Sequence, residues 1–216
     1  RSTLFPYTTL FRSRTGVTLD VVKSHKAVRV GFHPGGMYRL LGFSMAEMID
    51  GSYDAADVFG NEIQDVNNKL QEAISFDKIK EIIEQFLLAK VKLLKRALPF
   101  DHAMLELLRA NGNAPIEQIA SLACLSLRQF ERISKERIGF SPKVFARLVR
   151  FSKAYRLREN FPELSWTNIA YECGYFDQMH FIRDFKEFAG ITPGGIEKDL
   201  ETGSRSEERR VGKECR

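Results

Sequence analysis

The stretch CGYFDQMHFIRDFKEFAGITP at 173–193 decides the fold of this chain, because its plan occurs twice. The earlier copy is CLSLRQFERISKERIGFSP at 124–142. Key residues recur 51 positions apart, in the pairs Phe130/Phe181, Gly139/Gly190 and Pro142/Pro193. Upstream, the dipeptide Ile-Ala at 119–120 recurs at 169–170, fifty positions later, so one residue was gained in the second turn. Such spacing indicates that one supersecondary unit was duplicated.

Each copy predicts two short helices joined by a tight turn. In the first, a helix over 115–123 precedes Ser126, which begins the capping box S-x-x-Q of the next helix. In the second, Ser165 caps one helix, Gly174 supplies the turn and Asp177 caps the helix over 178–188. This is the helix-turn-helix pattern, in which the second helix fits a DNA major groove about 12 Å wide.

Helical periodicity assigns two faces to each second helix. The inward faces are aromatic or aliphatic: Phe130 and Ile133 in the first copy, and Phe181, Phe185 and Phe188 in the second. The outward faces carry two triplets that again lie 51 positions apart, namely Arg128, Arg132 and Lys135, and Met179, Arg183 and Lys186. A basic face opposite an apolar one is common on surface helices, but its repetition inside a duplicated helix-turn-helix favours DNA reading.

A third helix is predicted between the copies, from Ser141-Pro142 to about residue 159. Such a connector would hold two reading helices at a fixed separation. Its basic side chains are more plausible as phosphate contacts, or as solvated charges, than as base readers. The predicted phosphate contacts are Lys135, Lys143, Arg147, Arg150, Lys153 and Lys186.

The region 14–100 is expected to be the truncated end of an α+β domain whose beginning is missing, and the family resemblance described below implies that it is a sensor or dimerisation region. AVRVGFH at 27–33 is β-branched and alternating, which predicts a strand ended by Pro34-Gly35-Gly36. Short helices are predicted over 36–41 and 44–49, followed by an irregular segment to residue 60. Two longer helices follow, one over 61–73 and one capped by Ser75 or Asp77 that ends before Pro99.

The two ends of the chain have complementary coding sequences. Written as TCT, the codon of Ser13 has the reverse complement AGA, which encodes Arg205, and the pairing continues in frame to Ser2 and Arg216. Both ends resemble a translated sequencing-library adapter, so we interpret 1–13 and 205–216 as scars. Because a scar precedes Arg14, the natural protein is expected to be longer at its amino end. The expected divisions are 1–13 (scar), 14–100 (sensor remnant), 101–200 (DNA-binding domain) and 201–216 (tail and scar).

The distribution of charge supports a nucleic-acid partner only for residues 128–158. Without the two ends, the net charge falls from +5 to +1, yet residues 128–158 hold ten Lys or Arg against two Glu. A basic stripe of this kind is a footprint for phosphate, although a solvated helix face is the alternative. Cys124 and Cys173 lack metal-ligand spacing and are expected to be small buried packing residues. No membrane span, catalytic motif, cofactor or metal site is predicted.

IASLACLSLRQFERISKERIGFSPKVFARLVRFSKAYRL followed by SWTNIAYECGYFDQMHFIRDFKEFAGITP resembles the DNA-binding domain of AraC/XylS-type bacterial transcription regulators, over roughly 103–196. The resemblance places Ser134 where the family usually has a buried Phe, and Phe176 where it usually has a small polar residue. It also implies base-reading positions on both second helices: Arg128, Glu131 and Arg132 in the first, and Gln178, Met179, His180, Ile182 and Arg183 in the second.

The fold expected from these patterns is mainly α, with two helix-turn-helix units joined by a linker helix. The expected function is a sequence-specific transcription regulator, not an enzyme, that reads two successive major grooves of double-stranded DNA. The alternative is a protein-interaction module with a non-specific basic helical tail. The resemblance implies a cytoplasmic bacterial protein and allows RNA polymerase, a small-molecule effector and a homodimer through the missing amino-terminal region as partners.

Overall fold

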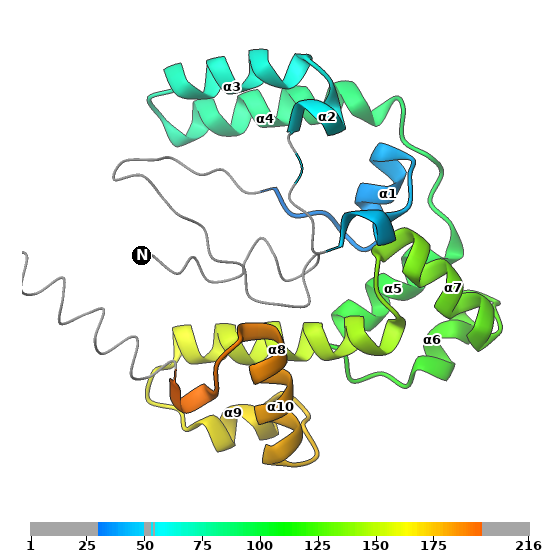
Figure 1. The fold of residues 1–216 in the computed structure, drawn as a ribbon, viewed down its shortest axis with the longest axis vertical. Coiled ribbons are helices and arrows are strands. Elements are labelled where there is room, and N and C mark those ends of the chain that lie inside the picture. The colour runs from blue at the N-terminus through cyan, green and yellow to red at the C-terminus, as the bar shows by residue number, and fades with distance from the viewer. Residues whose placement is uncertain (1–29, 50–52, 54, 196–216) are drawn as a thin grey trace, which may run out of the picture. The chain divides into compact units, whose positions relative to one another are not determined.

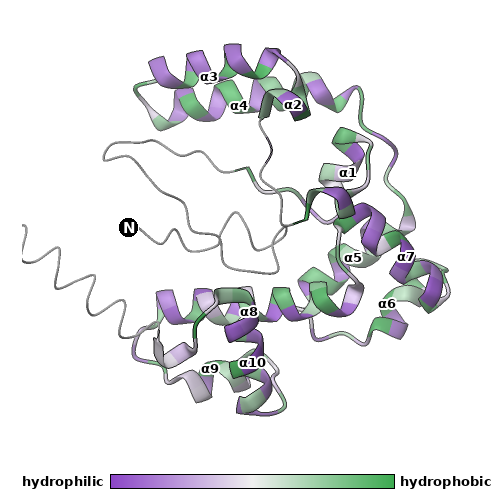
Figure 2. Cartoon of the chain, in the orientation of Figure 1, coloured by the Kyte–Doolittle hydropathy of each residue, from purple (hydrophilic) through white to green (hydrophobic). Residues whose placement is uncertain are grey.

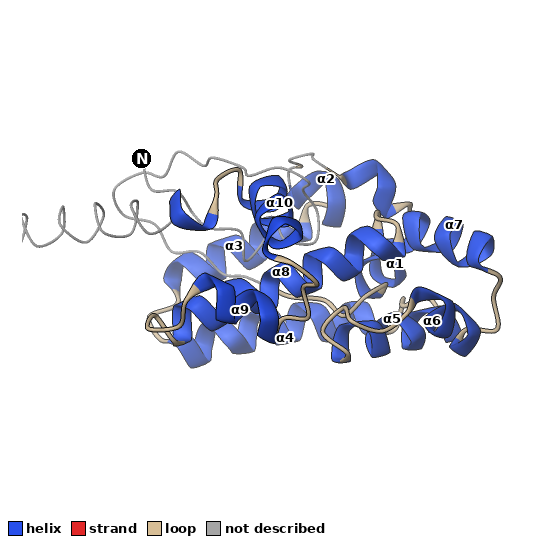
Figure 3. Cartoon of the chain, turned by 90° about the horizontal axis from the view of Figure 1, so that it is seen from below, coloured by secondary structure: helices blue, strands red, loops and turns tan. Residues whose placement is uncertain are grey.

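The computed structural model describes residues 30–49, 53 and 55–195. This part of the chain forms ten α-helices and one short 3-10 helix (Figures 1 and 3). No helix within it is long and apolar enough to cross a membrane. The described residues divide into two bodies. The amino-terminal body holds 30–110 and 114–145, and the carboxy-terminal body holds 111–113 and 146–195.

The predicted α+β remnant is wrong for the described residues, none of which forms a strand. Residues 30–33 form no strand, and 27–29 of the predicted strand lie outside the described part. A strand needs a neighbouring strand to pair its backbone groups, and the described part provides no neighbour for 30–33. Within the segment predicted as irregular, residues Ala55–Phe59 form helix α2.

The other amino-terminal helices follow the prediction. Helix α1 covers Gly36–Leu41 and the 3-10 helix η1 covers Met45–Met48. Helices α3 (Glu62–Glu72) and α4 (Phe76–Val91) pack against each other, and each carries both apolar and polar residues (Figure 2). Their shared apolar cluster comprises Val66, Ala73 and Ile82 with Ile63, Leu70, Ile79, Ile83 and Phe86. Of the two predicted caps for α4, Ser75 is the one used, because its hydroxyl accepts from the Lys78 amide at 3.2 Å.

The first helix-turn-helix lies in the amino-terminal body. It comprises α6 (Ile116–Leu122) and α7 (Leu127–Ile138), with α5 (Pro99–Arg109) packed against α6. The predicted capping box is present: the Ser126 hydroxyl accepts from the Gln129 amide at 3.3 Å, and the Gln129 side chain accepts from the Ser126 amide at 3.0 Å. Phe130 is completely buried, and its ring lies 5.0 Å from that of Phe100. An aromatic core therefore fixes the inward face of α7.

The second helix-turn-helix lies in the carboxy-terminal body and comprises α9 (Trp166–Glu172) and α10 (Gln178–Ala189). Helix α8 (Pro142–Asn160) precedes it and runs without interruption. Ser165 and Asp177 cap α9 and α10, as predicted. The core of this body is aromatic, with fully buried Phe151, Phe181 and Phe185 and with Trp166 packed against the last two.

The two turns make the same backbone hydrogen bond, but the second turn is one residue longer. The Leu125 amide donates to the Ala120 carbonyl, and the Tyr175 amide donates to the Ala170 carbonyl, both at 3.1 Å. Each turn has one residue with a positive φ, Cys124 in the first and Gly174 in the second. One residue separates Cys124 from the cap Ser126, whereas two residues separate Gly174 from the cap Asp177. Phe176 is the residue gained in the second turn.

Candidate nucleic-acid interface

The predicted base-reading residues of α7 all lie on its exposed face. Arg128, Glu131 and Arg132 are exposed, as is the predicted phosphate contact Lys135. Lys135 faces Glu131 at 3.4 Å, and Arg132 faces Glu136 at 3.6 Å, both pairs being one helical turn apart. Exposed ion pairs of this kind contribute little, about 0.3–0.5 kcal/mol on a helix. A phosphate or a base edge can therefore displace either pair at small cost.

Helix α10 presents a similar surface opposite its buried phenylalanines. Gln178, Met179, His180 and Arg183 are exposed, and so is the predicted phosphate contact Lys186. Ile182 is half-buried. The structure thus places on one helix a guanidinium, an amide, an imidazole and an exposed thioether, which between them can pair with guanine or adenine edges or contact a thymine methyl group.

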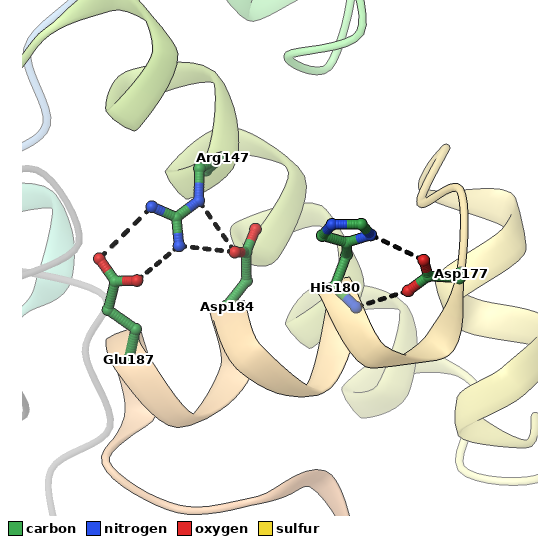
Figure 4. A network of polar contacts seen from close by, with 5 residues as sticks. All are labelled: Arg147, Asp177, His180, Asp184 and Glu187. Carbon is green, nitrogen blue, oxygen red and sulfur yellow. Dashed lines mark hydrogen bonds and ion pairs between the residues drawn. The ribbon is translucent and has the colours of Figure 1, made fainter.

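Asp177 fixes the orientation of His180 at the start of α10 (Figure 4). One Asp177 oxygen accepts from the His180 backbone amide at 2.7 Å, and the other lies 2.8 Å from the imidazole Nδ1. The backbone hydrogen bond from His180, together with the imidazole, lowers the pKa of the Asp177 carboxyl. Because Nδ1 faces this carboxylate, Nε2 is the ring nitrogen directed to other partners. In the neutral tautomer with Nδ1 protonated, Nε2 accepts a hydrogen bond.

Three of the predicted phosphate contacts have partners within the carboxy-terminal body. Arg147 donates to Asp184 and Glu187 of α10 (Figure 4). Arg150 donates to the Gly112 carbonyl at 2.7 Å, and its guanidinium lies 5.6 Å from the Tyr175 ring centre. Lys153 donates to the Glu172 carbonyl at 2.9 Å. The remaining contacts, Lys135, Lys143 and Lys186, are exposed.

Asp184, the buried carboxylate that accepts hydrogen bonds from Arg147, was not among the predicted site residues. Asp184 is only 5% exposed although it lies on α10 between charged positions. The signal was present in the spacing, because Asp184 precedes Phe185 and follows Phe181 by three positions, which places it at the edge of the apolar face. A carboxylate at such a position requires a cationic partner, and α8 supplies one.

The structure places two turn residues at the surface, of which only Cys124 differs from the prediction. Phe176 is 97% exposed, which excludes it from the core and leaves it beside the exposed face of α10. Cys124 is exposed, not buried, and has a positive φ of 55°; it corresponds to Gly174, whose φ is 78°. The tight turn needs a left-handed residue at this place, so turn geometry and not core packing determines the position of Cys124. Cys173 is buried, as predicted.

Ser134 shows how the first helix-turn-helix accommodates a small polar residue in its core. Its side chain is completely buried, and its hydroxyl donates to the Phe140 carbonyl at 2.7 Å. The hydroxyl is therefore satisfied, and it ties the last turn of α7 to the chain that follows. A buried polar group with a partner of this kind does not carry the penalty of an unpaired one.

Sequence comparison shows that the carboxy-terminal part of the chain is similar to helix-turn-helix transcription regulators. A family model described as a helix-turn-helix domain matches residues 119–199. An uncharacterised HTH-type transcriptional regulator of Haemophilus influenzae is 37% identical over 86 residues, which are 39% of this chain and 28% of that protein. The HTH-type transcriptional activators RhaS of Klebsiella pneumoniae and Escherichia coli are 35% and 34% identical over 80 residues, 37% of this chain and 28% of each relative.

The chain thus spans little more than a quarter of the length of the curated relatives that it matches. No solved structure matches it.

Proposed function

We propose that this protein regulates transcription by binding double-stranded DNA in a sequence-specific manner, because residues 119–199 match a helix-turn-helix domain and resemble AraC-family regulators. The family comprises DNA-binding transcription regulators and no enzymes. The observation that carries the proposal is the repeated exposed face: Arg128, Arg132 and Lys135 recur as Met179, Arg183 and Lys186, each triplet opposite a buried phenylalanine core.

The two helices α7 and α10 carry the base-reading residues. Arg128, Arg132 and Arg183 suit the O6 and N7 acceptors of guanine, and Gln178 suits the edge of adenine. His180, held by Asp177 through Nδ1, offers Nε2 to an amino group of adenine or cytosine. Met179, whose residue is 69% exposed, suits a thymine methyl group.

Phosphate contacts come from the exposed lysines Lys135, Lys143 and Lys186. Arg147, Arg150 and Lys153 keep their intramolecular partners and support the second helix-turn-helix from α8. Each phosphate contact releases condensed counterions, so affinity falls with salt in proportion to the number of contacts. In this proposal, α7 and α10 contact both bases and phosphates, whereas α8 mainly stabilises the second helix-turn-helix.

One monomer is proposed to read two successive major grooves, because the continuous helix α8 links the two helix-turn-helix units in the chain. Such a protein works in the cytoplasm, where bacterial DNA lies. An effector, RNA polymerase and a second copy of the chain are the partners expected for the complete protein.

The test is a selection of binding sites from a random duplex library, followed by mobility-shift titration of the full chain and three variants. Arg183→Ala should cost about 1–3 kcal/mol at one position of the selected site and relax the preference there. Lys186→Ala, on the same helix, should weaken all sequences alike and reduce the salt slope by about one. Lys143→Ala should behave as Lys186→Ala does.

Equal loss of affinity for selected and random duplexes in Arg183→Ala would contradict base reading by that residue. Binding that does not weaken as salt rises would contradict phosphate neutralisation. That outcome would favour the alternative, a helical module that contacts another protein.

A further inference from the structure

A segment that precedes the helix-turn-helix domain packs against the first reading helix. Residues 35–49, called the docking segment here, contain α1 and η1, and both helices contact α7 within the amino-terminal body. The Tyr38 hydroxyl of α1 donates to Glu136 Oε1 of α7 at 2.9 Å. The Tyr38 ring lies over the guanidinium of Arg137, 4.6 Å from ring centre to Cζ.

The docking segment covers a buried ion pair. Arg137 and Asp101 have side chains only 7% and 8% exposed and form two hydrogen bonds, Nε to Oδ1 at 3.0 Å and Nη2 to Oδ2 at 2.8 Å. Asp101 Oδ2 also accepts from the Leu98 amide at the start of α5 at 2.8 Å. A buried pair repays its desolvation cost only when its geometry is good and its remaining lone pairs are bonded. The two Arg137–Asp101 hydrogen bonds and the Leu98 amide meet that need, and the Tyr38 ring packs over the Arg137 guanidinium.

Two glycines show how closely the docking segment approaches. A Cβ on Gly35 would lie 2.2 Å from Asp101 Oδ1, and one on Gly139, just after α7, would lie 3.0 Å from the Met45 carbonyl oxygen and the Ile49 side chain. Met45 and Met48 of η1 are buried. The contact is therefore closely packed at both ends and is not a loose surface encounter.

Glu136 links this contact to the reading face. While Oε1 accepts from Tyr38, Oε2 lies 3.6 Å from Nη1 of Arg132, a proposed base reader. The Arg132 side chain is 71% exposed. Tyr38 donates as a neutral phenol, and its hydrogen bond to Glu136 raises its pKa further. One carboxylate thus lies between the docking segment and the guanidinium on the reading face.

We propose that Tyr38 is a positioning residue for DNA recognition: by holding Oε1 of Glu136, it limits that carboxylate to the loose 3.6 Å ion pair with Arg132, which a base can displace. The inference rests on the proposed function, in which Arg132 reads DNA. It implies that any event that lifts the docking segment from α7 changes the base preference at one position of the site. The region before the helix-turn-helix domain would thereby influence which sequence is bound.

The test uses Tyr38→Phe, which removes the hydroxyl and keeps the ring over Arg137. Site selection with the full chain first identifies the base pair whose preference Arg132→Ala relaxes. Tyr38→Phe should lower the preference at that same pair by about twofold, the size expected for an exposed helical ion pair, while leaving the pair read by Arg183 unchanged and lowering the thermal unfolding midpoint only slightly. In a Glu136→Gln background, Tyr38→Phe should have no further effect, because the carboxylate that transmits it is gone.

An unchanged preference at the Arg132 pair in Tyr38→Phe would overturn the inference. So would an equal loss for all sequences, which is the sign of a merely structural role, or an undiminished effect in the Glu136→Gln background. If Arg132→Ala relaxes no position while Arg183→Ala relaxes one, the inference fails and the proposed function stands. If neither variant changes any preference, the proposed function fails as well.

Discussion

Arg147 of α8 donates two hydrogen bonds to Asp184 of α10. Its Nε and Nη2 atoms lie 2.9 Å and 2.7 Å from the same carboxylate oxygen (Figure 4). Asp184 is buried, while the Arg147 side chain is 27% exposed and also contacts Glu187. The most basic part of the sequence therefore includes a charge that ties two helices of one body together.

Replacing Arg147 by Ala should destabilise the carboxy-terminal body, because Asp184 would remain buried without its partner. Removing one member of a buried pair costs about 3–5 kcal/mol, and partial exposure of Arg147 reduces this to about 2–3 kcal/mol. Trp166 is the single tryptophan of the chain and packs in this body, so denaturant unfolding followed by its fluorescence reports the loss. Arg156→Ala, an exposed position on the same helix, should change stability by less than about 0.5 kcal/mol.

Unaltered stability in Arg147→Ala together with a shallower salt slope of DNA binding would show that Arg147 contacts phosphate instead.

Spacing between the half-sites should control affinity. If α8 keeps both reading helices on successive major grooves, they meet the duplex about 34 Å apart, one turn of roughly 10 bp. Inserting about 5 bp rotates one half-site to the far side of the DNA. The protein can then contact both half-sites only if the DNA bends, and otherwise it must release one of them, at a cost of several kcal/mol. Mobility-shift titration of intact and spaced sites at one salt concentration measures it. Equal affinity for both would mean that one helix-turn-helix suffices.

The thiol of Cys173 should resist alkylation. Burial, together with the charge of Glu172 and against that of Lys153, raises the pKa of Cys173 to about 11. Iodoacetamide at pH 8 should therefore modify exposed Cys124 but leave Cys173 intact until the protein unfolds, since the thiolate is the reactive form. Peptide mass spectrometry after timed quenching distinguishes the two sites. Modification of both at equal rates would contradict the buried position.

The same shift has a stability consequence with a definite sign. Well below pH 9.0, the ordinary pKa of this thiol, it is protonated in both the folded and the unfolded state. Above that value the unfolded thiol ionises first, so the free energy of unfolding should fall as the pH rises toward about 11. Urea titrations of the wild type and Cys173→Ala across this range isolate the contribution. A decline of equal size in both proteins would assign it to other groups.

Gly112 should tolerate no side chain. Its φ is +74°, and an added Cβ would lie 2.2 Å from the Ala146 carbonyl oxygen, a backbone atom of α8. Gly190 has a similar φ of +75° but open space around it. Left-handed strain alone costs about 1–2 kcal/mol for alanine, so Gly190→Ala should lose that amount. Gly112→Ala should lose more, with Trp166 fluorescence as the measurement; equal losses would exclude the clash.

Features that depend on a few neighbouring residues were predictable from the sequence. Ser126, Ser165 and Asp177 cap the helices assigned to them, because a cap is completed within three residues of its own position. The inward and outward faces of α7 and α10 follow from helical periodicity alone. The duplication, the AraC-type resemblance and the exposed candidate readers therefore follow from the order of the residues by itself.

Tertiary structure alone decided which basic side chains stay free. Arg147, Arg150 and Lys153 looked equivalent to Lys143 in the sequence, yet all three have distant partners. Arg147 donates to two carboxylates 37 and 40 residues away, and Arg150 and Lys153 donate to carbonyl groups 38 and 19 residues away. The same holds for Tyr38 and Glu136, which are 98 residues apart, and for residues 30–33, which have no strand to pair with in the described part. Such contacts form only after packing brings distant segments together, and the local periodicity of a sequence does not predict which segments will meet.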